Sequence, residues 1–229
     1  MQWHRVGHRG APKEFPANTM RSFQRALEYG CTMMECDIQQ AANGVPVLAH
    51  DPVVTDKSGQ RYVIAEHSSD VLYGIDMGVG EGLPTLAELA LWAQGRCAIM
   101  ADMKCEGNGI EARVVEALSV LPMEELILSG ASKESRPVFQ ALAPMLPLSL
   151  TLSNEYRHLL EGADFSQIDT TFVTWEHPLL DTETVAALHA HHLKIFAWTV
   201  DDLPTMQRLV ALGVEGIISN RPELLATLR

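Results

Sequence analysis

Apolar residues along the chain alternate between two kinds of segment. Short runs rich in Val, Ile, Met and aromatic residues predict β-strands, and longer stretches with apolar positions three and four residues apart predict amphipathic helices. The predicted strands span residues 3–8, 32–38, 45–50, 97–104, 125–129, 147–153, 170–175, 194–200 and 215–219. The predicted helices include residues 19–29, 85–94, 109–121, 137–145, 182–191 and 203–212.

The borders of these segments carry residues that favour helix ends. Asn18 or Thr19 can begin the first helix, and Thr85 with Glu88 matches a capping box at the start of the second. Gly213 follows the last predicted helix, where a glycine commonly ends a helix. The apolar pattern and the end signals therefore agree.

Strands that alternate with helices usually pair in parallel through crossover helices. If segment 45–50 folds back on the second strand as a hairpin, eight βα units remain, which suits a (β/α)8 TIM barrel in a chain of 229 residues. A doubly wound open sheet is the alternative, but no Gly-x-Gly-x-x-Gly turn follows the first strand. We therefore predict an α/β protein with a single barrel domain over residues 1–229.

Residues 51–83 depart from this rhythm and show little periodicity. We predict a short insertion loop region within the barrel domain, after the second strand. Long irregular segments inside compact domains tend to be lids or binding loops.

Composition narrows the class of protein further. A hydrophobic content of 47% and a charged content of 20% are those of an ordinary globular protein. The formal net charge of −12 argues against a nucleic-acid partner, because phosphate backbones attract basic proteins. The N-terminus lacks an apolar signal region, and no segment approaches the length of a membrane span. We expect a cytoplasmic protein without stable membrane insertion; the sequence leaves its oligomeric state open.

Two histidines and two carboxylates near the N-terminus indicate the chemistry. Glu35 and Asp37 lie two apart on a predicted strand, so both carboxylates can face one ion. Carboxylate oxygens suit Mg²⁺ or Ca²⁺ better than softer metals. His8 and His50 end neighbouring predicted strands and can supply a general acid and a general base. Together these residues predict metal-assisted cleavage of a phosphate ester.

Further candidates stand at the ends of other predicted strands, where barrel active sites lie. Asp102 can complete a site of three carboxylates, and Lys104, two residues later, can contact a phosphate oxygen. Trp198 is a candidate for the wall of the substrate pocket. For Trp175 and Asn220, a pocket role and a structural role explain the sequence equally well.

The chain resembles the glycerophosphodiester phosphodiesterases over nearly its whole length. The most specific matches are Gly7-His8-Arg9-Gly10, Glu35-Cys36-Asp37 and the segment from Gly44 to Asp51. Further matches are Pro16-Ala17-Asn18-Thr19, Pro84-Thr85-Leu86-Ala87-Glu88-Leu89, Asp102-Met103-Lys104, Trp198-Thr199-Val200 and Gly213-Val214-Glu215-Gly216-Ile217.

The resemblance implies a (β/α)8 barrel that hydrolyses small-molecule glycerophosphodiesters to sn-glycerol 3-phosphate and an alcohol. It implies a divalent cation on Glu35, Asp37 and the carboxylate at position 102. It also implies that His8 and His50 form the acid/base pair, and that Arg9 and Lys104 hold the phosphate.

The chain departs from the family pattern at three positions. Ala17 stands where the family usually has Glu, Asp102 stands where it usually has Glu, and Asn220 stands where it often has Asp. The shorter Asp102 can still bind a hard cation. Ala17 bears on rate and substrate preference more than on the reaction class.

Two alternatives stay open at this point. One is a lysophospholipase D-like hydrolase of single-chain phospholipids, which an exposed apolar groove at residues 51–83 would favour. The other is a barrel that binds a phosphodiester without turnover, which Ala17 suggests. The sequence does not assign the acid and base roles to His8 and His50, and it does not decide between Mg²⁺ and Ca²⁺. It also does not decide whether water or a substrate hydroxyl attacks the phosphorus, and hence whether a cyclic phosphate forms.

Overall fold

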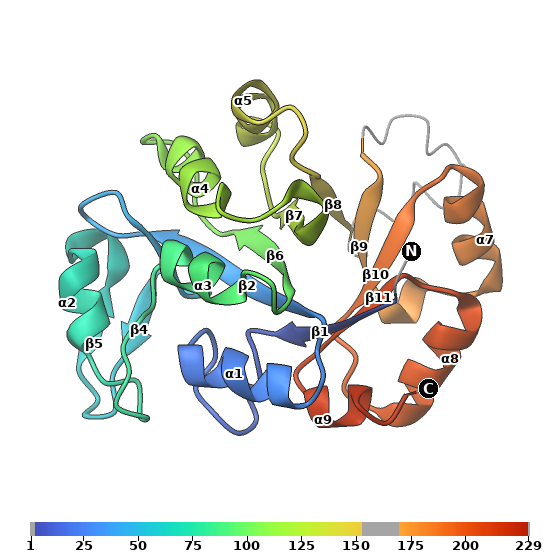
Figure 1. The fold of residues 1–229 in the computed structure, drawn as a ribbon, viewed down its shortest axis with the longest axis horizontal. Coiled ribbons are helices and arrows are strands. Elements are labelled where there is room, and N and C mark those ends of the chain that lie inside the picture. The colour runs from blue at the N-terminus through green and yellow to red at the C-terminus, as the bar shows by residue number, and fades with distance from the viewer. Residues whose placement is uncertain (1–2, 153–169, 229) are drawn as a thin grey trace.

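Eight parallel strands form the centre of the protein, with helices around them (Figure 1). The computed structural model describes residues 3–152 and 170–228. The strand order is β7-β6-β2-β1-β11-β10-β9-β8, and a bridge between Leu128 and Leu148 brings the two edges of the sheet together. This nearly closed sheet confirms the predicted (β/α)8 barrel. The strands are β1 (His4–His8), β2 (Met33–Gln40), β6 (Ala98–Met103), β7 (Leu126–Ser129), β8 (Ser149–Leu152), β9 (Phe172–Glu176), β10 (Lys194–Trp198) and β11 (Gly216–Ser219).

Helices follow the barrel strands in the predicted order. The crossover between β8 and β9 falls in residues 153–169, which lie outside the described residues together with the last residue of the predicted strand 147–153. Within the described ranges, no helix is both long and apolar enough to cross a membrane. The helices are α1 (Met20–Glu28), α3 (Leu86–Ala93), α4 (Ile110–Leu118), α5 (Ser135–Leu142), α7 (Thr182–Ala190), α8 (Leu203–Leu212) and α9 (Pro222–Leu225), with 3-10 turns at Ile64–Glu66, Met123–Glu125 and His177–Leu179.

The alternation of side chains along β2 separates two cores. Met34 and Cys36 belong to the large apolar cluster between the barrel and its helices. Met33 belongs to a smaller cluster, which also holds Phe172 and Phe196. Because successive strand residues point to opposite faces, Glu35 and Asp37 share the face of Met33. Both carboxylates therefore point into the barrel.

The segment after β2 is more regular than its sequence predicts. The strand β3 (Pro46–Leu48) pairs antiparallel with β2, which confirms the predicted hairpin. Beyond it, β4 (Val53–Thr55) and β5 (Arg61–Val63) form a two-stranded hairpin, and α2 (Ser69–Gly74) follows. The expectation of an irregular segment at 51–83 is wrong because three-residue strands are too short to show a period of two.

A side-chain turn and a small core of its own stabilise this segment. Asp56 Oδ1 accepts hydrogen bonds from the backbone N–H groups of Ser58 and Gln60 and so closes the hairpin. Ile64, Leu72 and other buried residues of the segment pack together against β3.

Gly10 permits the turn that follows β1, and its replacement is a test of the fold. Its φ is +86°, and an added Cβ would lie 2.6 Å from the Ser22 carbonyl oxygen of α1. We expect Gly10→Ala to lower the free energy of unfolding by about 2–5 kcal/mol, the sum of the left-handed backbone cost and overpacking. Gly30→Ala is the matched control, because Gly30 has φ +83° and no atom within 4 Å of the added Cβ. Urea unfolding that shows equal losses for both variants would contradict this account.

Candidate active site

Three carboxylates converge at the mouth of the barrel. Strand register places Asp37 of β2 beside Asp102 of β6, while Glu35 lies one interior position below Asp37. One oxygen from each of Glu35, Asp37 and Asp102 lies within 4.8 Å of the others. Glu35 and Asp37 are buried, with exposed fractions of 4% and 0%. The structure therefore brings together all three residues predicted to bind a metal.

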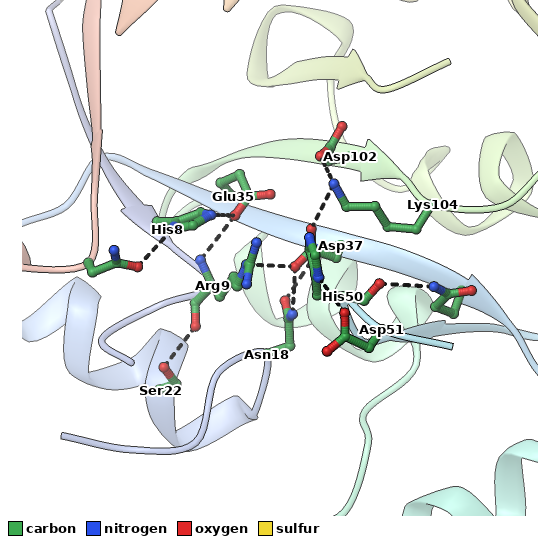
Figure 2. Close-up of polar contacts among 12 residues, drawn as sticks. His8, Arg9, Asn18, Ser22, Glu35, Asp37, His50, Asp51, Asp102 and Lys104 are labelled. Atoms are coloured by element: carbon green, nitrogen blue, oxygen red, sulfur yellow. Dashed lines mark hydrogen bonds and ion pairs between the residues drawn. The ribbon is translucent and has the colours of Figure 1, made fainter. Parts of the chain in front are cut away.

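His8 ends β1 beside this cluster, and a hydrogen bond with Asn220 orients its ring. Its register partner on β2 is Glu35, and its Nε2 lies 3.8 Å from Glu35 Oε2 (Figure 2). The other ring nitrogen, Nδ1, lies 2.7 Å from Asn220 Oδ1. Asn220 Nδ2 donates to Asp201 Oδ2 at 2.8 Å, and the Asn220 backbone N–H donates to Asp201 Oδ1 at 2.8 Å. A chain of polar contacts thus runs from Asp201 through Asn220 to His8.

His50 approaches the cluster from the hairpin after β2. The backbone N–H of Ala49 donates to the Asp37 carbonyl oxygen, and the Gln39 side chain donates to the His50 carbonyl oxygen. His50 Nδ1 lies 2.8 Å from Asp51 Oδ1, and the His50 side chain is 44% exposed. His50 therefore occupies the outer edge of the site, whereas His8 is more deeply placed.

Asp37 is the centre of the polar contacts in Figure 2. Arg9 Nε lies 2.8 Å from Asp37 Oδ2, and Asn18 Nδ2 donates to the same oxygen at 2.9 Å. The Lys104 ammonium lies 3.3 Å from Asp37 Oδ1 and also contacts Asp102. Arg9 and Lys104, which the resemblance assigns to the phosphate, both contact carboxylates of the cluster here.

Burial and charge set the protonation of the cluster. Burial, and then the neighbouring charges of Asp37 and Asp102, hold the pKa of Glu35 well above its ordinary value. Burial lowers the pKa of Lys104, but the charges of Asp102 and Asp37 outweigh it and the net shift is upward. Burial and the Arg9 charge lower the pKa of His8. The three crowded carboxylates thus repel one another and favour an added cation.

The donor set fits a hard divalent cation. All three groups supply oxygen, the type of ligand that Mg²⁺ and Ca²⁺ prefer. Asp37 Oδ1 is buried, and within the described part of the chain it contacts the Lys104 ammonium at 3.3 Å without a well-aligned hydrogen bond. A metal ion on these carboxylates would satisfy that oxygen and offset the repulsion at Glu35.

A cavity of about 280 Å³ opens beside the carboxylates. Trp198 lines it, as predicted for a pocket residue. Trp175 does not: it is 0% exposed within the outer apolar cluster, because its position on β9 points toward the helices. Ala17 and the described residues 51–83 are also outside the lining. The lining residues are His8, Arg9, Glu35, His50, Met100, Asp102, Lys104, Ser129, Thr151, Thr174, Trp198, Thr199 and Ile218.

Sequence reasoning missed several of the site's polar residues. Asn18 is not the helix cap, because Thr19 accepts the capping hydrogen bond from Ser22. Instead, Asn18 has φ +61° and turns its amide onto Asp37. Asp201 follows the Trp198-Thr199-Val200 motif directly, so a polar residue just beyond a strand end was its only signal.

The family model for glycerophosphoryl diester phosphodiesterases matches residues 8–224, nearly the whole chain. The chain belongs to the glycerophosphoryl diester phosphodiesterase family. A glycerophosphodiester phosphodiesterase of Caldanaerobacter subterraneus subsp. tengcongensis is 27% identical over 97% of this chain and 96% of the relative. Membership in this family makes the chain a phosphodiesterase by class.

Solved structures with this fold include members of the family. A glycerophosphodiester phosphodiesterase of Agrobacterium tumefaciens superposes with a TM-score of 0.84 at 20% identity, covering 100% of both chains. An Oleispira antarctica phosphodiesterase, solved in complex with the product sn-glycerol-3-phosphate, gives a TM-score of 0.83 at 23% identity and covers 96% of this chain and 94% of its own. At these identities the likeness establishes the barrel fold.

Proposed function

We propose that this phosphodiesterase hydrolyses glycerophosphodiesters to sn-glycerol 3-phosphate and an alcohol with the help of a divalent cation. The observation that carries the proposal is the carboxylate cluster of Glu35, Asp37 and Asp102 beside one cavity that His8 and His50 also line. The glycerophosphodiester phosphodiesterase relatives and the product bound to the Oleispira enzyme support this choice of substrate.

Glu35, Asp37 and Asp102 would hold Mg²⁺ or Ca²⁺. When bound, such an ion neutralises phosphate charge and stabilises the charge that develops in the transition state. Arg9, Lys104 and Trp198 are proposed to contact the substrate, since all three line the cavity.

The hydrogen bonds that surround His8 favour this residue as the general base. A carboxylate only accepts, so Asp201 fixes the Asn220 amide with Nδ2 toward itself and Oδ1 toward His8. Asn220 Oδ1 must then accept a hydrogen bond, which places the proton of neutral His8 on Nδ1. Nε2 keeps its lone pair and is the nitrogen nearer to Glu35. His8 is therefore poised to take a proton from the attacking water or substrate hydroxyl.

His50 is then the general acid. In its protonated form, His50 donates from Nδ1 to the Asp51 carboxylate, and its Nε2 carries a second proton that it can deliver to the leaving alkoxide. Its exposed position at the edge of the cavity suits a group that protonates the leaving alkoxide, which then departs to solvent as an alcohol.

The size of the cavity favours a small polar substrate over a single-chain lipid. A volume of about 280 Å³ lies at the lower limit of small-molecule sites. The segment 51–83, where an apolar groove would have favoured a lysophospholipid, contributes no described residue to the lining.

The proposal is tested by product identification. We expect the protein with Mg²⁺ or Ca²⁺ to release sn-glycerol 3-phosphate and choline from glycerophosphocholine, and to lose this activity on chelation. Lysophosphatidylcholine is the comparison substrate and should react far more slowly. Activity that survives both chelation and His8→Ala would contradict the mechanism, and release of phosphocholine would contradict the cleavage position.

Asn220 is proposed as a positioning residue for His8. We expect Asn220→Ala to lower kcat by about 10- to 100-fold, a part of the 10²–10⁴-fold that general base catalysis supplies, because His8 loses its fixed tautomer. KM should change little, since Asn220 is absent from the described cavity lining. Steady-state kinetics on glycerophosphocholine give the two values separately.

Asn43→Ala is the matched control for Asn220→Ala. The Asn43 side chain bonds to Ser69 in the segment after β2, away from the cavity. Asn43→Ala should lower the free energy of unfolding and leave kcat unchanged. Equal kcat losses in the two variants would assign Asn220 a general structural role instead.

A further inference from the structure

A pair of hydroxyls lies on the wall of the cavity opposite the carboxylates. Thr151 of β8 and Thr174 of β9 are register partners, and Thr174 Oγ1 donates to Thr151 Oγ1 at 2.9 Å. Around the barrel, β9 is four strands from β2 in either direction. Thr174 therefore faces Glu35 and Asp37 from across the barrel.

The pair has hydrogen-bonding capacity that no described residue uses. Each hydroxyl can donate one hydrogen bond and accept two. The bond between them uses the Thr174 proton and one lone pair of Thr151. Within residues 3–152 and 170–228, neither hydroxyl makes another hydrogen bond. The Thr151 proton and both lone pairs of Thr174 are left for a ligand, and Thr174 is only 3% exposed.

The surroundings divide the cavity into a charged half and a neutral half. His8, Arg9, Glu35, Asp102 and Lys104 come from β1, β2, β6 and the residues just beyond β1 and β6. On the other strands the described lining is neutral: Ser129, Thr151, Thr174, Trp198, Thr199 and Ile218. A phosphate over the charged half would direct one of its organic groups toward the threonine pair.

We propose that Thr151 and Thr174 form a polyol-binding subsite that selects phosphodiesters with a free glycerol end. The proposal rests on the proposed function and adds the group that determines substrate choice. His50, at the exposed edge, lies on the β2 side, where the alcohol leaves. The enclosed wall at β8 and β9 therefore receives the glycerol that is kept in the product. A donor and an acceptor side by side match the donor and acceptor of its terminal hydroxyl.

Binding of two phosphates that differ by one hydroxymethyl group tests this subsite. Dissociation constants of sn-glycerol 3-phosphate and 2-hydroxyethyl phosphate are measured by calorimetry with Mg²⁺ present. We expect the native protein to prefer glycerol 3-phosphate. Thr174→Val should weaken glycerol 3-phosphate binding about 10- to 100-fold, the effect of leaving a buried polar partner unpaired, and leave 2-hydroxyethyl phosphate binding unchanged.

Two further variants distinguish the effect of the Thr174 hydroxyl from the effect of side-chain packing. Thr174→Ser keeps the hydroxyl and should keep the preference, whereas Thr55→Val, on an exposed position of β4, should change nothing. Equal weakening of both phosphates, no weakening of either, or loss of preference in Thr174→Ser would overturn the subsite. Because this readout is binding, a failure to hydrolyse glycerophosphocholine would count against the proposed function and not against the subsite.

Discussion

His8→Ala is expected to lower kcat on glycerophosphocholine by about 10³- to 10⁴-fold, the upper part of the range for a positioned general base. The reason is geometric, since in the proposed tautomer His8 Nε2 is the ring nitrogen that keeps a lone pair beside Glu35. His50→Ala should cause a loss of similar size. Because the proposed roles of the two histidines belong to one step, the double variant should lose less than the product of the two single losses.

A substrate with a better leaving group distinguishes the two histidines. p-Nitrophenolate leaves without a proton, so a general acid matters little for glycerophospho-p-nitrophenol, whereas a general base matters as before. We expect His50→Ala to regain most of its activity on this substrate and His8→Ala to regain little. The reverse pattern would exchange the assigned roles.

The histidine control lies in the segment after β2. His67 Nδ1 contacts the Val63 carbonyl oxygen, and His67 is absent from the described cavity lining. His67→Ala should leave kcat unchanged. A comparable loss there would indicate that histidine replacement harms the fold and not the chemistry.

Glu35→Gln is expected to abolish tight cation binding and to lower kcat/KM by about 10³-fold or more. The ion is expected to supply several kcal/mol of transition-state stabilisation, and each loss of about 1.4 kcal/mol lowers the rate tenfold. Calorimetric titration with Mg²⁺ and Ca²⁺ and the assay on glycerophosphocholine measure the two effects. Undiminished cation affinity in Glu35→Gln would remove Glu35 from the proposed site.

In the metal-free protein, Glu35→Gln is expected to raise the free energy of unfolding. Burial and the charges of Asp37 and Asp102 raise the pKa of Glu35 in the folded state. The folded protein then holds this proton more tightly than the unfolded chain does. Its free energy of unfolding therefore falls as the pH rises from the ordinary glutamate range through the raised pKa. Without metal at pH 7, Glu35→Gln should be more stable than the native protein, and added cation should reverse the order.

Glu111 provides the matched control for a buried glutamate. Burial raises its pKa, but hydrogen bonds from the Gly107 N–H and the Ser135 hydroxyl outweigh burial and leave the pKa lowered. Its charge therefore stabilises the fold above the ordinary glutamate pKa. Glu111→Gln should lower stability at pH 7, with or without metal, and leave cation binding unchanged.

Local patterns in the sequence predict most of the barrel. Every described barrel strand overlaps a predicted strand. Apolar runs and amphipathic helical patterns extend over several residues, so a single exceptional residue does not obscure them. Prediction failed at residues 51–83, where the elements are as short as three residues and depend on an Asp56 turn and on burial against β3. The sequence pattern does not reveal such short elements, because they become stable only when a tertiary surface covers them.

The sequence alone was enough to predict that the carboxylates and histidines at the strand ends lie together, because residues two apart on a strand share a face and a barrel joins strand ends at one mouth. Their partners could be identified only in the folded protein. Asn220 and Asp201 orient His8, Asn18 contacts Asp37, and Trp175 turns outward. Likewise, Thr151 meets Thr174 only through the register of β8 and β9. Residues far apart along the chain make these contacts, and no local pattern encodes which of two strand faces, or which distant side chain, a polar group will meet.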